Sequence, residues 1–403
     1  MDARLLSAEL SLRPDLAAAP RAVAQTQAAA RSDGLDLARA LAILLVCIAH
    51  FGGLFAADTS PIFAALIYAG NAGVELFFSL SGFLIGRILI RLARDGLTAG
   101  SIGNFWARRW LRTLPLYYVT LVVVCWWLGL WDLRSFLFVQ NFGFQSRPQP
   151  MIVSWSLVME EYFYLSFPLL MLALSRLQPR RFNGLRCAAG VAVGLAVTCM
   201  LTRIGLNVAG LGGADGSFHL NPLLRLDCAA YGVLAACLWD TRRAMRLLSV
   251  PAMPALIVVA VLLFLLLDGT LYVRALGDAG FVRFIHYDTW KLLYVPSRDA
   301  LMNAAFAVFV LALAEIRLGR ALRFPARWLS RLSYSIYLVH VPVLFFLVPA
   351  VMPSATLAGR VTAAILATLA LSFATYSLIE TPFLALRDHI FPPRAKRPAA
   401  ALV

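Results

Sequence analysis

The sequence predicts an all-α polytopic membrane protein with about ten transmembrane helices and both termini in the cytoplasm. Of its 403 residues, 61% are hydrophobic and only 14% are charged, and the mean hydropathy is +0.78. A soluble domain of this composition would have to expose many apolar side chains to water, whereas lipid is a compatible solvent for them. Long apolar runs also alternate with short basic clusters, as in chains that cross a bilayer repeatedly.

Ten apolar segments account for the predicted membrane helices, and each is about 20 residues long, enough to cross a bilayer. They lie near residues 36–56, 72–92, 112–131, 152–174, 187–207, 222–240, 253–272, 299–316, 332–350 and 361–381. The apolar run 62–69 is too short to cross, so we expect it to lie at the membrane interface or to re-enter the membrane.

The distribution of basic residues predicts the orientation. With a cytoplasmic N-terminus, the internal regions carry 26 Lys and Arg residues and the external loops carry seven. Because cytoplasmic loops of membrane proteins are enriched in Lys and Arg, both termini are predicted to be cytoplasmic. We expect residues 1–33 to form a disordered tail, 34–386 the membrane domain, and 387–403 a basic tail beside anionic lipid headgroups.

The net charge of +15 does not indicate a nucleic-acid partner, because the basic residues stand between apolar runs and form no continuous groove. The six cysteines all lie in apolar stretches without paired spacing, and we interpret them as small buried hydrophobic residues. No grouping of His, Glu and Cys in the sequence has metal-ligand spacing, so neither a metal site nor a bound cofactor is predicted.

Ionisable residues in the first span are candidates for function, because charged groups in hydrocarbon are costly. Asp36, Arg39 and His50 lie there, and the eleven residues from Arg39 to His50 return to within about 20° of the same helix face. Glu160, near the outer end of the fourth span, is predicted at a depth similar to His50, where it would orient the ring of a general base. The alternative is that His50 only hydrogen-bonds another helix. The neighbouring Glu161 points about 100° away and is expected at the rim.

Two arginines form a second cluster at the cytoplasmic mouth of the third span. Arg109 and Arg112 are three residues apart and therefore share a helix face. The planar fork of arginine suits phosphate oxygens, which predicts an anion site. The alternative is that both residues only signal topology.

Other polar residues within the spans are predicted to support these two sites. Arg225 and Asp227 lie in the outer half of the sixth span, either in a functional role or as a neutralised structural pair. The remaining supporting candidates are Glu75 in the second span, Tyr337 and His340 at helical spacing in the ninth, and Glu380 before Pro382 in the tenth. Tyr337 and His340 are also compatible with packing residues whose polar tips are hydrogen-bonded.

Motifs that follow one another over residues 34–386 resemble the acyltransferase-3 family of integral membrane O-acyltransferases. They are Gly34-Leu35-Asp36-x-x-Arg39 with His50, Gly73-Val74-Glu75-Leu76-Phe77-Phe78-Ser79-Leu80-Ser81-Gly82-Phe83-Leu84-Ile85, Arg109-x-x-Arg112-x-x-Pro115, Trp155-Ser156-Leu157-x-x-Glu160, Arg225-x-Asp227 with Gly232, Leu332-Ser333-Tyr334-x-Ile336-Tyr337-x-x-His340, and Ile379-Glu380-x-Pro382. One departure is Glu75, where many members of the family have Asp, a change that keeps the charge.

The resemblance implies a ten-helix enzyme that moves an acyl group, usually acetyl, from cytoplasmic acyl-CoA to a hydroxyl group of a glycan, glycolipid or glycoside. It also implies roles for individual residues. His50 matches the essential histidine of the family, Arg39 its arginine in the first helix, Arg109 and Arg112 its proposed acyl-CoA contacts, and Glu160 the glutamate of the fourth-span motif.

We therefore predict a multi-pass O-acyltransferase of the bacterial inner membrane, with acetyl-CoA or another acyl-CoA as co-substrate and membrane lipid around it. The alternative is a polytopic transporter of a lipid-linked or anionic substrate, although the sequence contains no inverted repeat. A membrane sensor is a third interpretation, but the loops and tails are short. The external loop 273–298 is rich in aromatic residues (Phe281, Phe284, Tyr287, Trp290 and Tyr294), which either bind the acceptor or anchor the loop among headgroups.

Overall fold

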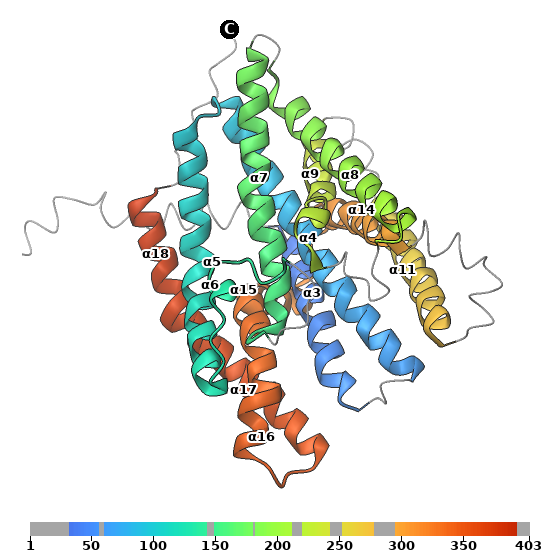
Figure 1. Ribbon diagram of the computed structural model, residues 1–403, viewed down its shortest axis with the longest axis vertical. Helices are drawn as coiled ribbons and strands as arrows, with labels where there is room; N and C mark the ends of the chain where they lie inside the picture. Colours follow the sequence, from blue (N-terminus) through green and yellow to red (C-terminus); the bar gives the residue numbers. More distant parts are fainter. Residues whose placement is uncertain are drawn as a thin grey trace, which may run out of the picture.

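The computed structural model describes residues 32–55, 60–142, 149–179, 182–211, 220–241, 252–277 and 295–392. Within these ranges the chain forms helices and no strands, and the helices gather into one bundle (Figure 1). The five aromatic residues of loop 273–298 and most of both predicted tails lie outside the described residues. Residues 387–390 of the predicted C-terminal tail are helical and belong to α18 (Thr381–Ile390).

Eight helical stretches in the described ranges are long and apolar enough to cross a membrane. This finding confirms the predicted fold class. The stretches are α3 (Asp33–Gly53), α4 (Pro61–Arg94), α5 (Ala99–Leu128), α7 (Trp155–Leu177) with the 3-10 turn η1 (Ile152–Ser154), α8 (Gly184–Val208), α11 (Met253–Gly277), α15 (Arg320–Pro342) with its continuation to Val351, and α17 (Leu357–Thr375) with its continuation to Ile390.

The two other predicted spans, 299–316 and 222–240, are also helical, but neither is among these eight stretches. The span 299–316 lies largely in α14 (Val295–Leu313). The span 222–240 divides into the 3-10 turn η4 (Leu223–Arg225), a stretch of turns, and the ten-residue helix α9 (Ala230–Trp239). A single helix over 222–240 is therefore wrong, and the divided stretch contains two charged residues whose ion pairs are described below.

The apolar run 62–69 is not a separate piece, because these residues are the first turns of α4, and its expected location at the membrane interface stays a prediction. Ser60 caps this helix by accepting a hydrogen bond from the N–H of Phe63, and Pro61 occupies the first turn. Proline is favoured at that position, and no later proline interrupts the 34 residues of the helix.

Two long helical stretches contain short π-helical segments next to prolines. In the first, η6 (Val343–Leu347) follows Pro342 and leads into α16 (Val348–Val351). In the second, η7 (Tyr376–Glu380) leads into α18, whose second residue is Pro382. Proline has no N–H for the regular helical hydrogen bond, so the helix changes its winding there instead of continuing unchanged.

Glycines allow α4 and α9 to cross with their backbones in contact. A methyl group on Gly82 would lie 1.9 Å from the carbonyl oxygen of Ala229, and one on Gly232 would lie 2.0 Å from that of Ser79. These separations are far below any van der Waals contact, so each helix needs glycine where it meets the other. This crossing holds the middle of α4, which bears part of the site described below.

The chain between α5 and α7 folds back into the bundle. It contains the short helix α6 (Leu133–Phe136), and its residues Ser135, Gln140 and Ser154 are at most 2% exposed. The Tyr117 hydroxyl donates a hydrogen bond to the carbonyl of Ser135 over 2.7 Å, although Tyr117 lies eleven residues before the end of α5. Since eleven helical residues span roughly 16 Å, α7 begins well inside the bundle.

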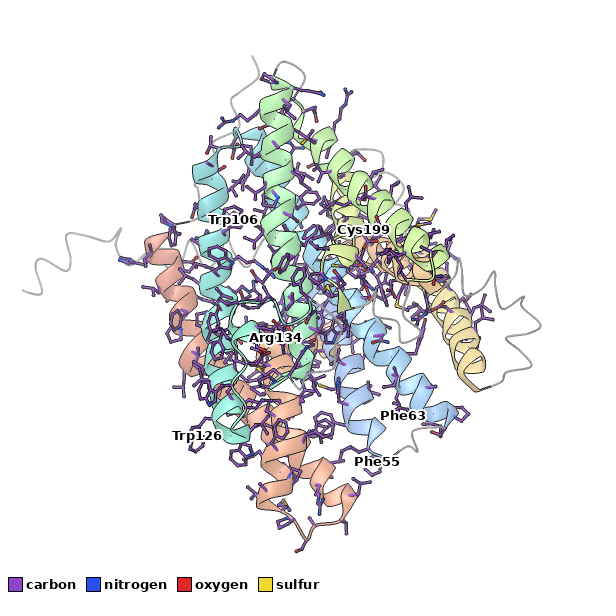
Figure 2. The ribbon with its side chains drawn as sticks, in the orientation of Figure 1. Phe55, Phe63, Trp106, Trp126, Arg134 and Cys199 are labelled. Atoms are coloured by element: carbon purple, nitrogen blue, oxygen red, sulfur yellow. The ribbon has the colours of Figure 1, made fainter. Side chains whose placement is uncertain are left out.

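Apolar side chains cover the outer faces of the bundle as well as its core. Trp126, near the end of α5, is 74% exposed and projects from the bundle in Figure 2. In α11 only 11% of the most apolar window is buried within the protein. Exposed apolar surface on this scale is stable only against lipid, so the structure supports a multi-pass membrane protein.

Candidate active site

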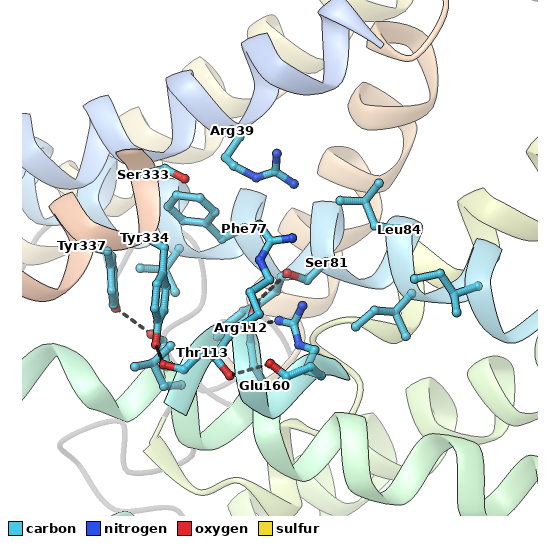
Figure 3. Close-up of a pocket in the computed structure, with 17 residues that line it drawn as sticks. Arg39, Phe77, Ser81, Leu84, Arg112, Thr113, Glu160, Ser333, Tyr334 and Tyr337 are labelled. Carbon is cyan, nitrogen blue, oxygen red and sulfur yellow. Dashed lines mark hydrogen bonds and ion pairs between the residues drawn. The ribbon is translucent and has the colours of Figure 1, made fainter. Parts of the chain in front are cut away.

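A cavity of about 180 Å³ lies between α3, α4, α5, α7 and α15. Its polar lining includes three guanidinium groups and one carboxylate, from Arg39, Arg109, Arg112 and Glu160 (Figure 3). The structure thus brings together four of the predicted site residues from three different helices. Aromatic side chains of α4 and α15, namely Phe77, Tyr334 and Tyr337, form much of the remaining wall.

Glu160 is held on the cavity wall by α4 and α5. Its Oε1 accepts a hydrogen bond of 2.7 Å from the hydroxyl of Ser81, and its Oε2 lies 3.1 Å from a guanidinium nitrogen of Arg109. Arg109 also donates to the hydroxyl of Tyr164, one turn after Glu160, and its guanidinium carbon lies 3.8 Å from the centre of that ring. The charge of Arg109 is therefore compensated within the protein.

Arg112 has a different environment from Arg109. Its side chain is exposed and lines the cavity. Among the residues that the structure describes, none forms a hydrogen bond or a salt bridge with it. The carboxylate of Glu380 acts on Arg112 only at a longer range than a salt bridge. A guanidinium group that has neither a hydrogen bond nor a salt bridge inside a membrane protein is a ready binding point for an anion.

Arg39 approaches the same cavity from α3, as Figure 3 shows. Its Nη1 donates to the hydroxyl of Ser330 over 3.1 Å and lies 3.9 Å from Oδ1 of Asp36. The Ser330 hydroxyl in turn donates to Asp36 over 2.6 Å. Asp36 is 2% exposed, so it acts from behind to orient Arg39 and does not itself face the cavity.

The predicted pair of His50 and Glu160 is wrong. His50 is half-buried on α3, its Nδ1 is 2.9 Å from the carbonyl oxygen of Val46, and its ring contacts the ring of His340 at a centroid distance of 4.9 Å. Glu160 instead binds Ser81 and Arg109. His50 is absent from the cavity lining that the structure describes, but His340 lies 6.0 Å from Tyr337, which is part of that lining.

The error in pairing has a structural reason, which is depth along the helices. The helix α5 begins at Ala99, thirteen residues before the predicted start, so Arg109 lies roughly 15 Å along it. Because the chain before α7 folds back into the bundle, Glu160 in the second turn of α7 lies deeper than expected. Glu160 of the predicted outer site thus meets the arginines of the predicted inner site in one cavity, without His50.

The position predicted for Glu161 is also wrong, because this residue is not at a rim. It is 8% exposed and accepts a hydrogen bond of 3.0 Å from the indole N–H of Trp110 on α5. A second link between α5 and α7 therefore lies directly beside Arg109 and Glu160.

Arg225 and Asp227 of the sixth predicted span form three buried ion pairs in two separate groups. One guanidinium nitrogen of Arg225 binds both carboxylate oxygens of Glu75 at 2.6 and 2.7 Å, and another binds Asp299. Asp227 binds Arg203 of α8 through both of its oxygens, at 2.8 and 2.9 Å. Arg225 and Asp227 are thus each neutralised by residues of other helices and not by one another, as one of the two alternatives had it. Both lie outside the described cavity lining.

The other predicted supporting residues lie on or near α15. Tyr337 lines the cavity and donates to the carbonyl of Val153 over 2.8 Å, while its hydroxyl lies 2.6 Å from that of Ser156. Glu380 is 5% exposed and accepts a hydrogen bond from the hydroxyl of Ser335. In the described part of the chain, no three His, Cys, Asp or Glu side chains gather as metal ligands.

Several residues of these networks carried no predicted role, among them Ser81, Tyr164, Asp299 and Ser330. Tyr164 follows Glu160 by four residues, a helical spacing that places both on one face and was available in the sequence. Ser81, Asp299 and Ser330 meet their partners only through tertiary contacts between distant helices, so no local pattern marks them.

Comparisons with known proteins agree with this architecture. Residues 32–377 match the family described as an acyltransferase domain, acyltransferase-3. The chain is 25% identical over 381 residues to the peptidoglycan O-acetyltransferase OatA of Listeria monocytogenes, covering 86% of this chain and 55% of that protein. It is also 25% identical over 375 residues to the putative peptidoglycan O-acetyltransferase YrhL of Bacillus subtilis, covering 87% and 54%.

A putative O-acetyltransferase of Staphylococcus aureus is 26% identical over 233 residues, covering 51% of this chain and 34% of that protein. The chain thus spans about half the length of the first two relatives. No solved structure matches it. Since the family match covers most of the 403 residues, the chain belongs to the acyltransferase-3 family of acyltransferases.

Proposed function

We propose that the protein transfers an acyl group, acetyl as the first candidate, from acyl-CoA to a hydroxyl group of a glycan, glycolipid or glycoside. The observation that carries the proposal is the cavity, where the guanidinium groups of Arg39 and Arg112 face the same space and no described residue forms a hydrogen bond or a salt bridge with Arg112. A donor with several phosphate groups and a long neutral arm suits a cationic cavity with aromatic walls.

On this proposal, Arg112 binds a phosphate group of CoA, with Arg39 beside it. Asp36 and Ser330 hold Arg39 in place, so less side-chain freedom is lost when the anion binds. Arg109 is less available because Glu160 neutralises it. Its part is to fix α5 against α7 and thereby the direction of Arg112, one turn further along α5.

His50 is the proposed general base. Its Nδ1 faces the carbonyl of Val46, which only accepts hydrogen bonds, so the ring proton is on Nδ1 and the lone pair of the neutral ring is on Nε2. Nε2 removes the proton of the acceptor hydroxyl, the oxygen bonds to the thioester carbonyl carbon, and the carbon–sulfur bond breaks. The proton then passes from His50 to the leaving thiolate, which becomes free CoA.

The thioester has to reach beyond the wall formed by Tyr337. This residue lines the cavity, is 6.0 Å from His340, and His340 is 4.9 Å from His50, measured between ring centres. The extended arm of an acyl-CoA is the part of the donor able to cover such a distance while its phosphates stay at Arg112. A short acyl group fits this arrangement better than a long one.

The proposed glycan acceptor is inferred from the relatives, and the proposed side of the membrane is inferred from the distribution of basic residues. Two relatives are named for the O-acetylation of peptidoglycan, which supports a glycan acceptor for this chain. The bias of 26 internal against seven external basic residues supports cytoplasmic termini, so α3 runs outward from Asp36 to His50. Donor entry from the cytoplasm and transfer near the outer side of the bacterial inner membrane follow from that orientation.

The test is acyl transfer by the full chain, purified in lipid nanodiscs, from radiolabelled acetyl-CoA to solubilised peptidoglycan fragments or to water. We expect the wild-type protein to release CoA and His50→Ala to lose about 100- to 10,000-fold in rate, the range of general-base contributions. His389→Ala is the matched control, because His389 is exposed at the end of α18, and it should keep full activity.

The variant is informative only if it stays folded, so its melting temperature and acetyl-CoA affinity are measured as well. Full activity in a folded His50→Ala protein would contradict the proposed base. If the wild-type protein in liposomes carried an anion across the bilayer without releasing CoA, the transporter alternative would replace the proposal.

A further inference from the structure

A second imidazole lies directly against His50, and the proposed chemistry above does not use it. The rings of His50 on α3 and His340 on α15 are 4.9 Å apart at an interplanar angle of 75°. His340 is 0% exposed, and the rings of Phe51 and Tyr337 lie 6.4 and 6.0 Å from it. His50 therefore has a wholly buried nitrogen heterocycle as its neighbour.

Both imidazoles present the same nitrogen as an acceptor. The Nδ1 of His340 is 2.9 Å from the carbonyl oxygen of Ile336, just as the Nδ1 of His50 is 2.9 Å from that of Val46. A carbonyl oxygen donates no hydrogen bond, so each Nδ1 carries the ring hydrogen. In the neutral rings, each Nε2 therefore has a lone pair that faces away from its own helix.

The Nε2 of His340 is buried and has no hydrogen-bond partner in the part of the chain that the structure describes. Leaving a buried polar atom unpaired is unfavourable, and an apolar side chain of the same size would avoid this cost. An acceptor in this position is useful when a donor appears beside it during only part of a reaction cycle. The protonated form of His50 is such a donor.

We propose that His340 is a positioning residue for the acyl transfer proposed above, on which this inference rests. When the acceptor hydroxyl gives its proton to Nε2 of His50, the new N–H group is shared between the acceptor oxygen and the Nε2 of His340, which accepts the second branch of a bifurcated hydrogen bond. His340 itself gains and loses no proton, and the proton leaves His50 for the thiolate of CoA. The contact stabilises a charge that forms only after the proton moves, and it acts on rate more than on donor binding.

The backbone next to His340 is consistent with a fixed orientation of its side chain. The helix α15 ends at Pro342, two residues after His340, and the next five residues are π-helical. Segments of this kind occur frequently at functional sites, because they change the direction of side chains within a continuous helix. The direct contact with His50 lies immediately before this change.

The experiment compares His340→Phe with His340→Gln in the full chain, in the same nanodisc assay. Phenylalanine keeps the aromatic packing and removes the acceptor, whereas the glutamine amide restores an acceptor with poorer packing. We expect His340→Phe to lose about 10- to 100-fold in kcat, the range for a hydrogen bond to a charged group, with acetyl-CoA affinity unchanged and the melting temperature unchanged or raised. His340→Gln is expected to recover most of the rate, and His389→Phe serves as the control for loss of a histidine elsewhere.

The opposite order would overturn the inference, since a packing role predicts an active His340→Phe protein and a weakened His340→Gln protein. Equal loss in both variants together with a lower melting temperature would also reject it, because His340 would then be a structural residue. Failure of the proposed function would give a different result. The wild-type protein would then release no CoA, or a folded His50→Ala protein would release CoA as fast as the wild-type protein.

Discussion

Two arginines on one face of α5 have unequal surroundings, although their spacing made them equivalent. The Nη2 of Arg109 is 3.1 Å from the Oε2 of Glu160, and its guanidinium group lies over the ring of Tyr164. Both partners lie on one face of α7, and together they compensate the charge of Arg109. Arg112 lines the cavity and, within the described residues, has neither a salt bridge nor a hydrogen bond. We therefore expect the two arginines to have different roles: Arg112 binds the anion, and Arg109 joins α5 to α7.

The first prediction tests that division by separate substitutions. Arg112→Ala should weaken acetyl-CoA binding about 10- to 100-fold, because a charge-assisted hydrogen bond is lost, and should leave the melting temperature unchanged. Arg109→Ala should instead lower the free energy of unfolding by roughly 1–3 kcal/mol, since Glu160 keeps its charge without a partner. Calorimetric titration with acetyl-CoA and thermal unfolding in nanodiscs measure the two effects.

The double variant Arg109→Ala with Glu160→Gln supplies the control. Removing the charge of Glu160 should restore most of the stability that Arg109→Ala loses, as for any coupled pair. If Arg109→Ala instead abolished acetyl-CoA binding without a change in stability, the two arginines would share one role, as their spacing first suggested.

Among the helices, α4 and α9 cross with a close backbone contact directly beside a residue of the site. Gly82 directly follows Ser81, which holds Glu160, and its place against Ala229 leaves no room for a side chain. Gly232 faces Ser79 in the reciprocal position. The crossing therefore determines where the polar face of α4 meets the cavity.

We predict that Gly82→Ala and Gly232→Ala each lower the free energy of unfolding by about 1–3 kcal/mol or more, because the added methyl group forces two helices apart. Gly103→Ala is the matched control within α5, since a methyl group there meets no atom within 4 Å. It should be neutral or stabilising by about 0.4–1 kcal/mol. Thermal unfolding in nanodiscs gives all three values, and unchanged stability of both crossing variants would contradict the described packing.

Sequence reasoning predicted individual helices better than the contacts between them. Composition and apolar run length located most of the membrane helices, and Asp36, Arg39 and His50 all lie on α3 as the first predicted span had them. The partner of Glu160 could not be predicted in this way, because it depends on how far residues 129–142 and 149–154 fold back into the bundle. The partners of Arg225 likewise come from α4 and α14, which the sequence separates by more than 70 residues in each direction.

For the whole molecule, orientation in the membrane remains the property that the proposed transfer depends on most. We predict that a cysteine at Phe55, which is 57% exposed just after α3, reacts with an impermeant thiol reagent outside intact spheroplasts. A cysteine at the exposed Asp95, just after α4, should react only after lysis. The native cysteines are replaced first, and both variants must retain the rate of CoA release.

Labelling of Asp95→Cys but not Phe55→Cys in intact spheroplasts would reverse the orientation. The donor would then have to enter from outside the cell, where acyl-CoA is not made, and transfer from a cytoplasmic donor would lose its support. Equal labelling of both in intact spheroplasts would indicate leaky membranes and calls for a permeability check with a cytosolic marker protein.

The unpartnered guanidinium of Arg112 has a consequence for how the enzyme would respond to the metabolic state of the cell. Acyl-CoA and free CoA carry the same phosphates, so a site that recognises those phosphates holds the product as readily as the donor. Turnover would then follow the ratio of the acylated to the free coenzyme rather than the concentration of the donor alone. Surface modification would slow when acetyl groups are scarce, without any separate regulatory site.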